Sequence, residues 1–185
     1  MDMNKSLHNS FIIFTLTVLL LATSCEENYV PESSLEMRDT LIYLKGSDEP
    51  FTGREKARVN DKIIEYDIVK GMKHGEFMIY HKNGNIQIKG QLDNNRNFGK
   101  WKYYYESGQL ESEGYFADDQ PDGKWLWYSP AGKLKEEGRY KQGRRFGLWR
   151  NYDDSGNVIL EKEFSIDDTT TVNADFFDRF NTPNE

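Results

Sequence analysis

The chain has 185 residues, of which 37% are hydrophobic and 30% charged, and its formal net charge is −7. This length allows one domain or one repeat array with short tails. The aromatic share of 14% indicates that rings supply much of the apolar burial, because each buried ring contributes a large area. The acidic balance, without blocks of Lys or Arg, argues against a nucleic-acid partner, whose affinity would come from neutralised phosphates.

The first predicted element is an export leader over residues 1–24. Lys5 gives a positive n-region, and the apolar run of residues 11–22 fits a signal-peptide core but is too short for a spanning helix. The run ends at Ser24 and Cys25, the one cysteine of the chain. This ending resembles the lipobox of bacterial lipoproteins. The resemblance implies cleavage before Cys25 and lipid attachment to it, whereas an uncleaved anchor or a chance cysteine is the alternative.

Residues 25–40 are predicted to be a polar tether between the lipid and the folded part. A lipid at one end attaches a protein to a membrane without spanning it. Glu26 and Glu27 resemble the export tag that sends some Gram-negative lipoproteins to the outer face of the outer membrane, although a solvated tether explains them equally well. The predicted location is the bacterial cell envelope, as an outer-membrane lipoprotein, and the tag implies surface exposure.

A 24-residue repeat follows, and repeats of this length indicate an array of supersecondary units. Each unit has a glycine, an aromatic residue two places on, a tyrosine five places on, and further glycines nine and fifteen places on. The first four columns are Gly75, Gly99, Gly123 and Gly147; Phe77, Trp101, Trp125 and Trp149; Tyr80, Tyr104, Tyr128 and Tyr152; and Gly84, Gly108, Gly132 and Gly156. The last glycine column is Gly90, Gly114 and Gly138, with Lys162 in the fourth place.

Each unit is predicted to be a β-hairpin. A small or polar residue precedes the mid-unit glycine, as in Ser107-Gly108, and such pairs mark tight hairpin turns. Taking that pair as a two-residue loop places Trp101 opposite Gly114. The same count places Phe77 opposite Gly90, Trp125 opposite Gly138 and Trp149 opposite Lys162. An aromatic ring can stabilise a strand by covering the bare backbone of a glycine.

Strand alternation then separates an aromatic face from a mostly charged face. The predicted fold class is all-β: an elongated antiparallel sheet of tandem hairpins over residues 41–165. A parallel β-solenoid is the alternative, but it would not require a hairpin turn in mid-unit. Residues 166–185 are predicted to be a tail or capping segment. A short helix there, begun by Asn173 and carrying Phe176, Phe177 and Phe180, could cover the open end of the sheet.

The segments 99–116 and 123–140 resemble the MORN-repeat variant of bacterial proteins known as YwqK-type antitoxin components. The resemblance extends over residues 41–165, except that residues 50–70 lack the glycine, aromatic and tyrosine columns. It implies the fold class more firmly than a function, because repeats of this kind serve as scaffolds in unrelated settings.

The sequence predicts no enzyme, no cofactor and no metal site. Of the three histidines, His8 lies in the leader, while His74 and His81 are expected at exposed positions of the first full unit. The acidic turns do not supply the six to eight oxygens that a Ca²⁺ site needs.

The candidate interaction face consists of Trp101, Tyr103, Trp125 and Trp127. Trp127 is singled out because Ile79, Tyr103 and Asn151 hold its column in the other units, so the repeat does not require Trp there. Trp is frequent in binding hot spots. The other interpretation is that these rings form the protein's own core.

The function predicted from the sequence is a non-enzymatic, membrane-anchored lipoprotein that acts as a protein-interaction or scaffold module. One alternative is an antitoxin or immunity-type protein that neutralises a toxin partner. The other is a binder of cell-wall or surface glycan through the aromatic face.

Overall fold

A computed structural model describes residues 29–59 and 62–165. Most of this part is β-strand, and a short 3-10 helix, η1 (Glu32–Ser34), is the one helix within it. The strands are β1 (Tyr29–Pro31), β2 (Leu35–Arg38), β3 (Leu41–Leu44), β4 (Gly53–Val59), β5 (Lys62–Val69), β6 (Met72–Tyr80), β7 (Ile86–Asp93), β8 (Arg96–Tyr104), β9 (Leu110–Ala117), β10 (Gln120–Pro121), β11 (Gly123–Tyr128), β12 (Leu134–Lys141), β13 (Arg144–Tyr152) and β14 (Val158–Phe164). The predicted all-β fold class is confirmed.

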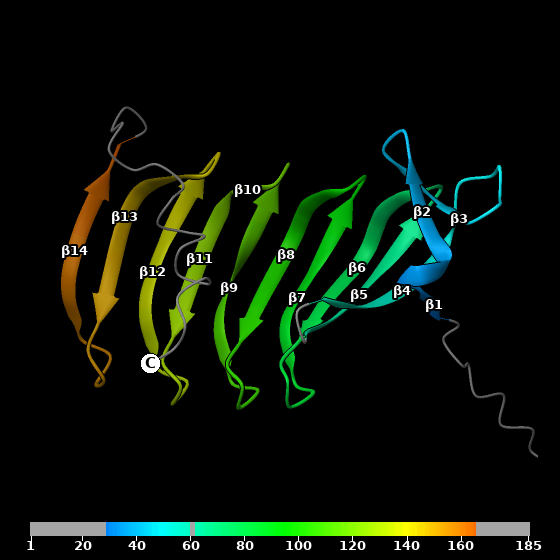
Figure 1. The fold of residues 1–185 in the computed structure, drawn as a ribbon. Helices are drawn as coiled ribbons and strands as arrows, with labels where there is room; N and C mark the ends of the chain where they lie inside the picture. The colour runs from blue at the N-terminus through cyan, green and yellow to red at the C-terminus, as the bar shows by residue number, and fades with distance from the viewer. Residues whose placement is uncertain (1–28, 60–61, 166–185) are drawn as a thin grey trace, which may run out of the picture.

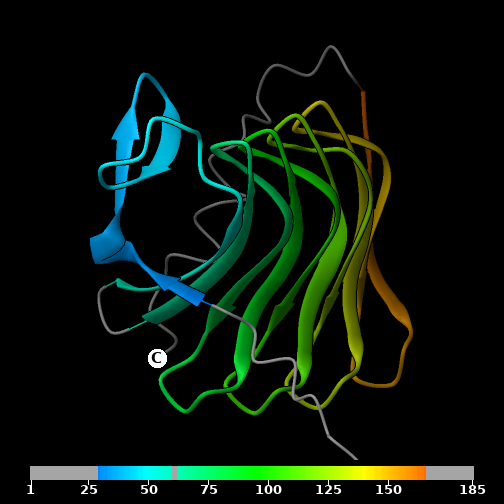
Figure 2. The same cartoon turned by 90° about the vertical axis from the view of Figure 1, so that its right-hand side faces the viewer.

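The strands form one long sheet in chain order, β1-β4-β5-β6-β7-β8-β9-β11-β12-β13-β14, with β10 beside β9 (Figure 1). The pairing is antiparallel except between β1 and β4. A view along the sheet shows that it is strongly bent and that the β2–β3 hairpin stands apart at the N-terminal end (Figure 2). The predicted antiparallel meander is therefore confirmed, and the alternative of a parallel solenoid is wrong.

The N-terminal part corrects one predicted boundary. The tether was expected to run over residues 25–40, but residues 29–38 form β1, η1 and β2. Tyr29 pairs with Arg54 of β4, and the Tyr29 hydroxyl donates a hydrogen bond of 3.2 Å to Glu65. The sheet therefore already includes Tyr29, four residues after Cys25.

The mid-unit turns are one residue longer than predicted. In the second full unit, the Gly108 amide donates to the Tyr105 carbonyl at 2.8 Å, and the Tyr105 amide donates to Gln109. Gly108 has a φ of 84°, so the loop is a three-residue hairpin whose last residue is left-handed. Tyr104 consequently pairs with Leu110, and a bulge follows before Tyr103 pairs with Ser112.

Because the bulge compensates for the longer loop, the predicted pairs deeper in each hairpin are confirmed. Trp101 lies opposite Gly114 and Phe77 opposite Gly90. Trp125 lies opposite Gly138, and Trp149 lies opposite Lys162.

The links between hairpins are two-residue turns in which both central residues have positive φ. Asn94 and Asn95 have φ values of 49° and 69°, and Asp118 and Asp119 have 49° and 66°. Asn and Asp tolerate this conformation better than other side chains. The turns also join neighbouring units, because the Asn97 amide donates to the Asp119 carboxylate at 2.7 Å.

Candidate interaction surfaces

The aromatic face is the core of the sheet. Its rings lie side by side along the array, on the same, adjacent or next-but-one strands, with centroid separations of 5.1–6.5 Å. Trp125 is central: its centroid lies 5.8 Å from that of Trp127 and 5.5 Å from that of Phe116. Such contacts contribute about 0.5–1.5 kcal/mol each beyond the burial of apolar area.

The four rings proposed as an exposed interaction face are buried. Trp101, Tyr103, Trp125 and Trp127 have 4%, 7%, 0% and 8% of their surface exposed. Trp127 does pair with Glu136, as the register predicted, but its ring packs on Trp125 and Trp149. Of the two interpretations that the sequence left open, burial supports the protein's own core and corrects the prediction of an accessible face.

The ring that covers each glycine is not the one that the predicted pairing indicated. A side chain added at Gly114 would meet the Trp125 ring at 2.0 Å, and one added at Gly90 would meet Trp101 at 2.3 Å. At Gly138 the ring encountered is that of Trp149, at 2.1 Å. Each glycine therefore seats the tryptophan of the next hairpin, not the residue opposite it in its own hairpin.

The opposite face carries a ladder of alternating charges that pair across the strands. Glu113 meets Lys100 at 2.9 Å and Lys102 at 3.9 Å, and Glu137 meets Lys124 at 2.8 Å and Arg150 at 3.6 Å. The hydrogen bond from Lys124 is the largest influence lowering the pKa of Glu137 below its ordinary value. This face is thus charged but largely neutralised within itself.

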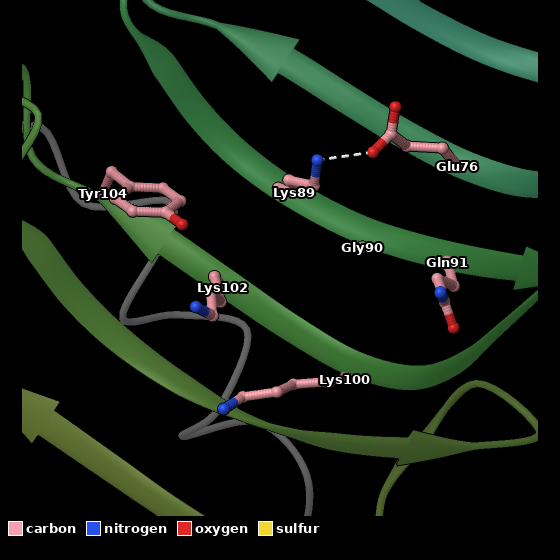
Figure 3. A pocket seen from close by; sticks show the side chains of 7 residues that line it. All are labelled: Glu76, Lys89, Gly90, Gln91, Lys100, Lys102 and Tyr104. Atoms are coloured by element: carbon pink, nitrogen blue, oxygen red, sulfur yellow. Dashed lines mark ion pairs between the residues drawn. The ribbon is translucent and has the colours of Figure 1, made fainter.

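Two hollows lie on the charged face at equivalent places, two units apart. The larger, of about 380 Å³, lies over Gly90 and is lined by Lys89, Lys100, Lys102 and Tyr104 (Figure 3). The smaller, of about 240 Å³, lies over Gly138. In the larger hollow Lys89 pairs with Glu76, and the pKa of Glu76 is lowered chiefly by that hydrogen bond.

No metal site is assembled among the described residues. They contain no group of three or more His, Cys, Asp or Glu side chains placed to hold a metal ion. His81 contacts the Tyr104 carbonyl through Nε2 at 2.7 Å, and His74 lies 3.2 Å from Asp93. Over residues 29–59 and 62–165, no helix is long and apolar enough to cross a membrane. Cys25 and the predicted C-terminal helix lie outside the described residues.

A third surface was missed in the sequence: the free edge of the sheet at β14. Val158, Ile159 and Leu160 are 46%, 65% and 59% exposed, and β13 is the only described strand paired with β14. The repeat alignment already indicated that β14 is unusual. The earlier units hold Gln87, Glu111 and Lys135 at the position of Ile159.

Comparison with known proteins supports the hairpin units. The family model for the MORN repeat variant matches residues 73–94, 99–118 and 121–142, which cover most of β6–β7, most of β8–β9 and all of β11–β12. The chain is therefore a β-hairpin repeat protein, and three of its hairpins match the family model of the MORN repeat variant. A comparison with curated proteins found no match.

One similarity to a solved structure is weaker. It is with a chain in the crystal structure of accessory secretory protein 1,2 and 3 in Streptococcus pneumoniae, at 15% identity and a TM-score of 0.32. The alignment covers 68% of this chain and 21% of that chain, so this chain spans about a fifth of the other's length. A TM-score of this size supports no conclusion.

Proposed function

We propose that this protein is a non-enzymatic, lipid-anchored envelope protein that acts as a protein-interaction module through the free edge of its repeat array. The leader, Cys25 and the acidic pair after it support the anchor and an outer-membrane location with surface exposure. The MORN-type hairpins support the interaction role. The observation that carries the proposal is the exposed aliphatic edge at Val158, Ile159 and Leu160.

The position of Tyr29 limits how far the proposed anchor could lie from the sheet. A lipid on Cys25 is joined to β1 by a link that reaches at most about 14 Å, because Tyr29 already belongs to the sheet. β14 lies ten strand spacings away along the sheet, or about 48 Å at the usual spacing. A lipid on Cys25 would therefore hold the first strand near the bilayer, and β14 would be the edge that can extend farthest from it.

The edge at β14 is unlike the other strands in composition. The columns of Ile159 and Leu160 hold Lys135 and Glu136 in the unit before. Sheet proteins usually protect a free edge with charge, because exposed backbone groups invite pairing. An aliphatic triad at this place does the opposite and favours strand addition.

The occupant we propose is an extended strand of another protein. Its apolar side chains would meet Val158, Ile159 and Leu160, and a basic residue would face the exposed carboxylate of Glu163. A further repeat of the same type does not fit, because Lys162 stands where the next tryptophan would need a glycine. The glycan alternative loses the rings that motivated it, since they are buried. No specific contact favours a toxin over another protein partner.

The test replaces two residues of the β14 edge by the residues that the preceding unit has at the same positions. Full-length protein is extracted from native membranes in mild detergent, and its complexes are sized on native gels. We expect wild type to run in a complex with another protein, and Ile159→Lys with Leu160→Glu to run alone with an unlowered melting temperature. Met37→Lys, at an exposed apolar residue of β2, is the control that keeps the complex.

Three outcomes would overturn the edge proposal. The complex could persist in the double variant, wild type could run as a single chain, or it could run only as a dimer of itself. The anchor is tested separately. Cys25→Ala should abolish palmitate labelling and release the protein from the membrane, and retained lipid would refute it. Proteinase K added to intact cells should degrade a surface-exposed protein, whereas protection until the outer membrane is broken would place it inside.

A further inference from the structure

The hollow over Gly90 on the charged face carries an excess of positive charge. Three lysines from β7 and β8 line it (Figure 3): Lys89, Lys100 and Lys102. Their side chains are 46%, 43% and 40% exposed. Two carboxylates pair with these three ammonium groups, because Glu76 contacts Lys89 and Glu113 is shared between Lys100 at 2.9 Å and Lys102 at 3.9 Å. Positive charge therefore remains in the hollow, where solvent can reach it.

Two of the three lysines stand directly opposite each other. Lys89 of β7 pairs with Lys102 of β8, and like charges at opposed positions destabilise a sheet. At the equivalent places between the other hairpins, the partners are Glu65 and Met78, Glu113 and Leu126, and Glu137 and Arg150. An anionic group bound between the two lysines would remove their repulsion.

The hollow over Gly138 has the same balance of charged residues. Lys124, Arg139 and Arg150 line it together with Glu137. Glu137 is shared between Lys124 and Arg150, and Arg139 forms no ion pair with the acidic side chains of the described residues. Each hollow thus has three cations and one carboxylate in its lining. They lie four strand spacings apart, or about 19 Å.

An exposed phenylalanine accompanies each hollow. Phe98 pairs with Gln91 of the first hollow, and Phe146 pairs with Arg139 of the second. Directly paired residues share a face of the sheet, so both rings lie on the charged face, where they are 53% and 40% exposed. The unit between them has Asp122 in this column. An apolar contact is therefore available beside each cationic hollow.

We infer that the charged face binds an extended acidic segment of a partner protein. Its carboxylates enter the two hollows, and its apolar parts lie on Phe98 and Phe146. The larger hollow, of about 380 Å³, has room for a side chain and the chain beside it, since one water molecule takes about 30 Å³. About six residues of extended chain cover the distance between the hollows.

The polar groups of the hollows favour carboxylates over sugar hydroxyls. Hydroxyls also need hydrogen-bond acceptors, but the one carboxylate in each lining, Glu76 or Glu137, is already paired with two cations. A surface of anionic lipid would meet the whole protein, whose net charge of −7 opposes such an approach. The inference uses no residue of the β14 edge, so it stands or falls separately from the proposed strand addition.

The probe is a fluorescent peptide of twelve alternating Glu and Thr residues, and the matched probe has Gln in place of Glu. Fluorescence anisotropy is measured with the full chain in mild detergent. We expect the Glu peptide alone to bind, and Lys89→Gln with Lys102→Gln to weaken its binding about tenfold. Lys124→Gln with Arg139→Gln and, separately, Phe98→Ser should weaken it as well.

The control variant is Lys133→Gln with Lys135→Gln. Both side chains contact Asp154, outside the two hollows, and the change in net charge is the same. Its affinity should stay within about twofold of wild type, because salt screens distant charges. A second measurement needs no variant: the Glu peptide should raise the melting temperature of the wild-type chain, and the Gln peptide should not.

Three outcomes would overturn the inference. The Glu and Gln peptides could have the same effect on wild type, or the control variant could lose as much affinity as the lysine variant of the first hollow. Polygalacturonate or phosphatidylglycerol vesicles could also bind through Lys89 and Lys102 while the Glu peptide does not, which would assign the face to a glycan or to a membrane.

Discussion

The interior hairpins and the two ends of the array are stabilised in different ways. In the interior, a tryptophan of one hairpin lies on a glycine of the hairpin before it, as Trp125 does on Gly114. At the C-terminal end β14 is the last strand of the described residues, and the glycine column holds Lys162. At the N-terminal end, Tyr66 stands in the glycine column, and the smaller Phe77 packs beside it at 6.5 Å.

This comparison shows what the glycine column is for. A glycine is present wherever a next tryptophan must lie flat on the backbone, and it is absent where none follows. A glycine in a strand costs about 0.5–1 kcal/mol relative to alanine, so it is retained where a ring offsets that cost. The glycine column therefore allows successive hairpins to pack on one another. It does not serve to stabilise each hairpin by itself.

The charged face at the N-terminal end carries a network of ion pairs centred on Arg54. Arg54 lies 2.9 Å from Asp67, 3.3 Å from Glu76 and 3.6 Å from Glu65. Lys56 lies 2.8 Å from Glu65. This network lies on the charged face and connects β1, β4, β5 and β6.

The largest expected effect is the loss of an interior ring. Trp125→Ala should lower the free energy of unfolding by about 3–5 kcal/mol, as for other buried large-to-small changes. Tyr115→Ala, on the exposed side of β9, should change it by less than about 0.5 kcal/mol. Urea unfolding followed by circular dichroism measures both. A similar loss of unfolding free energy in the two variants would show that the aromatic face is not the core.

The next largest effect is expected when valine is placed at two positions of the glycine column, one in the interior and one at the C-terminal end. Gly138→Val should cost about 1–3 kcal/mol, because the new side chain displaces Trp149. Lys162→Val should change stability by less than about 0.5 kcal/mol, because no tryptophan of a following hairpin lies on that position within the described part of the chain. Thermal melts of the two variants beside wild type provide the comparison. If valine were tolerated equally at both positions, the account of the glycine column would fail.

The smallest effect concerns two buried glutamates at the N-terminal end. Burial raises the pKa of Glu55 above its ordinary value. Burial acts in the same direction on Glu65, but hydrogen bonds from Lys56, Tyr80 and Tyr29 outweigh it, and the pKa of Glu65 is lowered. The Glu65 carboxylate therefore stabilises the fold above the ordinary glutamate range, and this contribution is lost as the pH falls through its lowered pKa. The Glu55 carboxylate costs stability above its raised pKa.

Glu65→Gln should therefore destabilise the protein at pH 7 by about 1 kcal/mol, and Glu55→Gln should be neutral or stabilising. Both differences should shrink toward zero as the pH falls below the ordinary glutamate range. Urea midpoints measured from pH 3 to pH 8 test the two signs. Destabilisation by Glu55→Gln at pH 7 that grew with rising pH would contradict the assignment.

Much of this fold could be predicted because the repeat is a local pattern. The columns, the two faces and the pairing of Trp101 with Gly114 all follow from positions within one unit. The partner of each glycine could not be found in this way, because Trp125 reaches Gly114 across a link between units. The strand that begins at Tyr29 was not predicted for a similar reason, since β1 pairs with β4 across more than twenty residues. Trp127 was misjudged because its column is variable, while its burial depends on Trp125 and Trp149.

A double-mutant cycle tests the central claim most directly. Gly114→Ala is combined with Trp125→Leu and, separately, with Trp101→Leu, and the free energy of unfolding of each variant is measured. The account predicts a coupling energy of about 1–2 kcal/mol with Trp125, whose ring lies on Gly114, and much less with Trp101, which is only its cross-strand neighbour. Coupling to Trp101 with none to Trp125 would show that each glycine serves its own hairpin and would contradict the account.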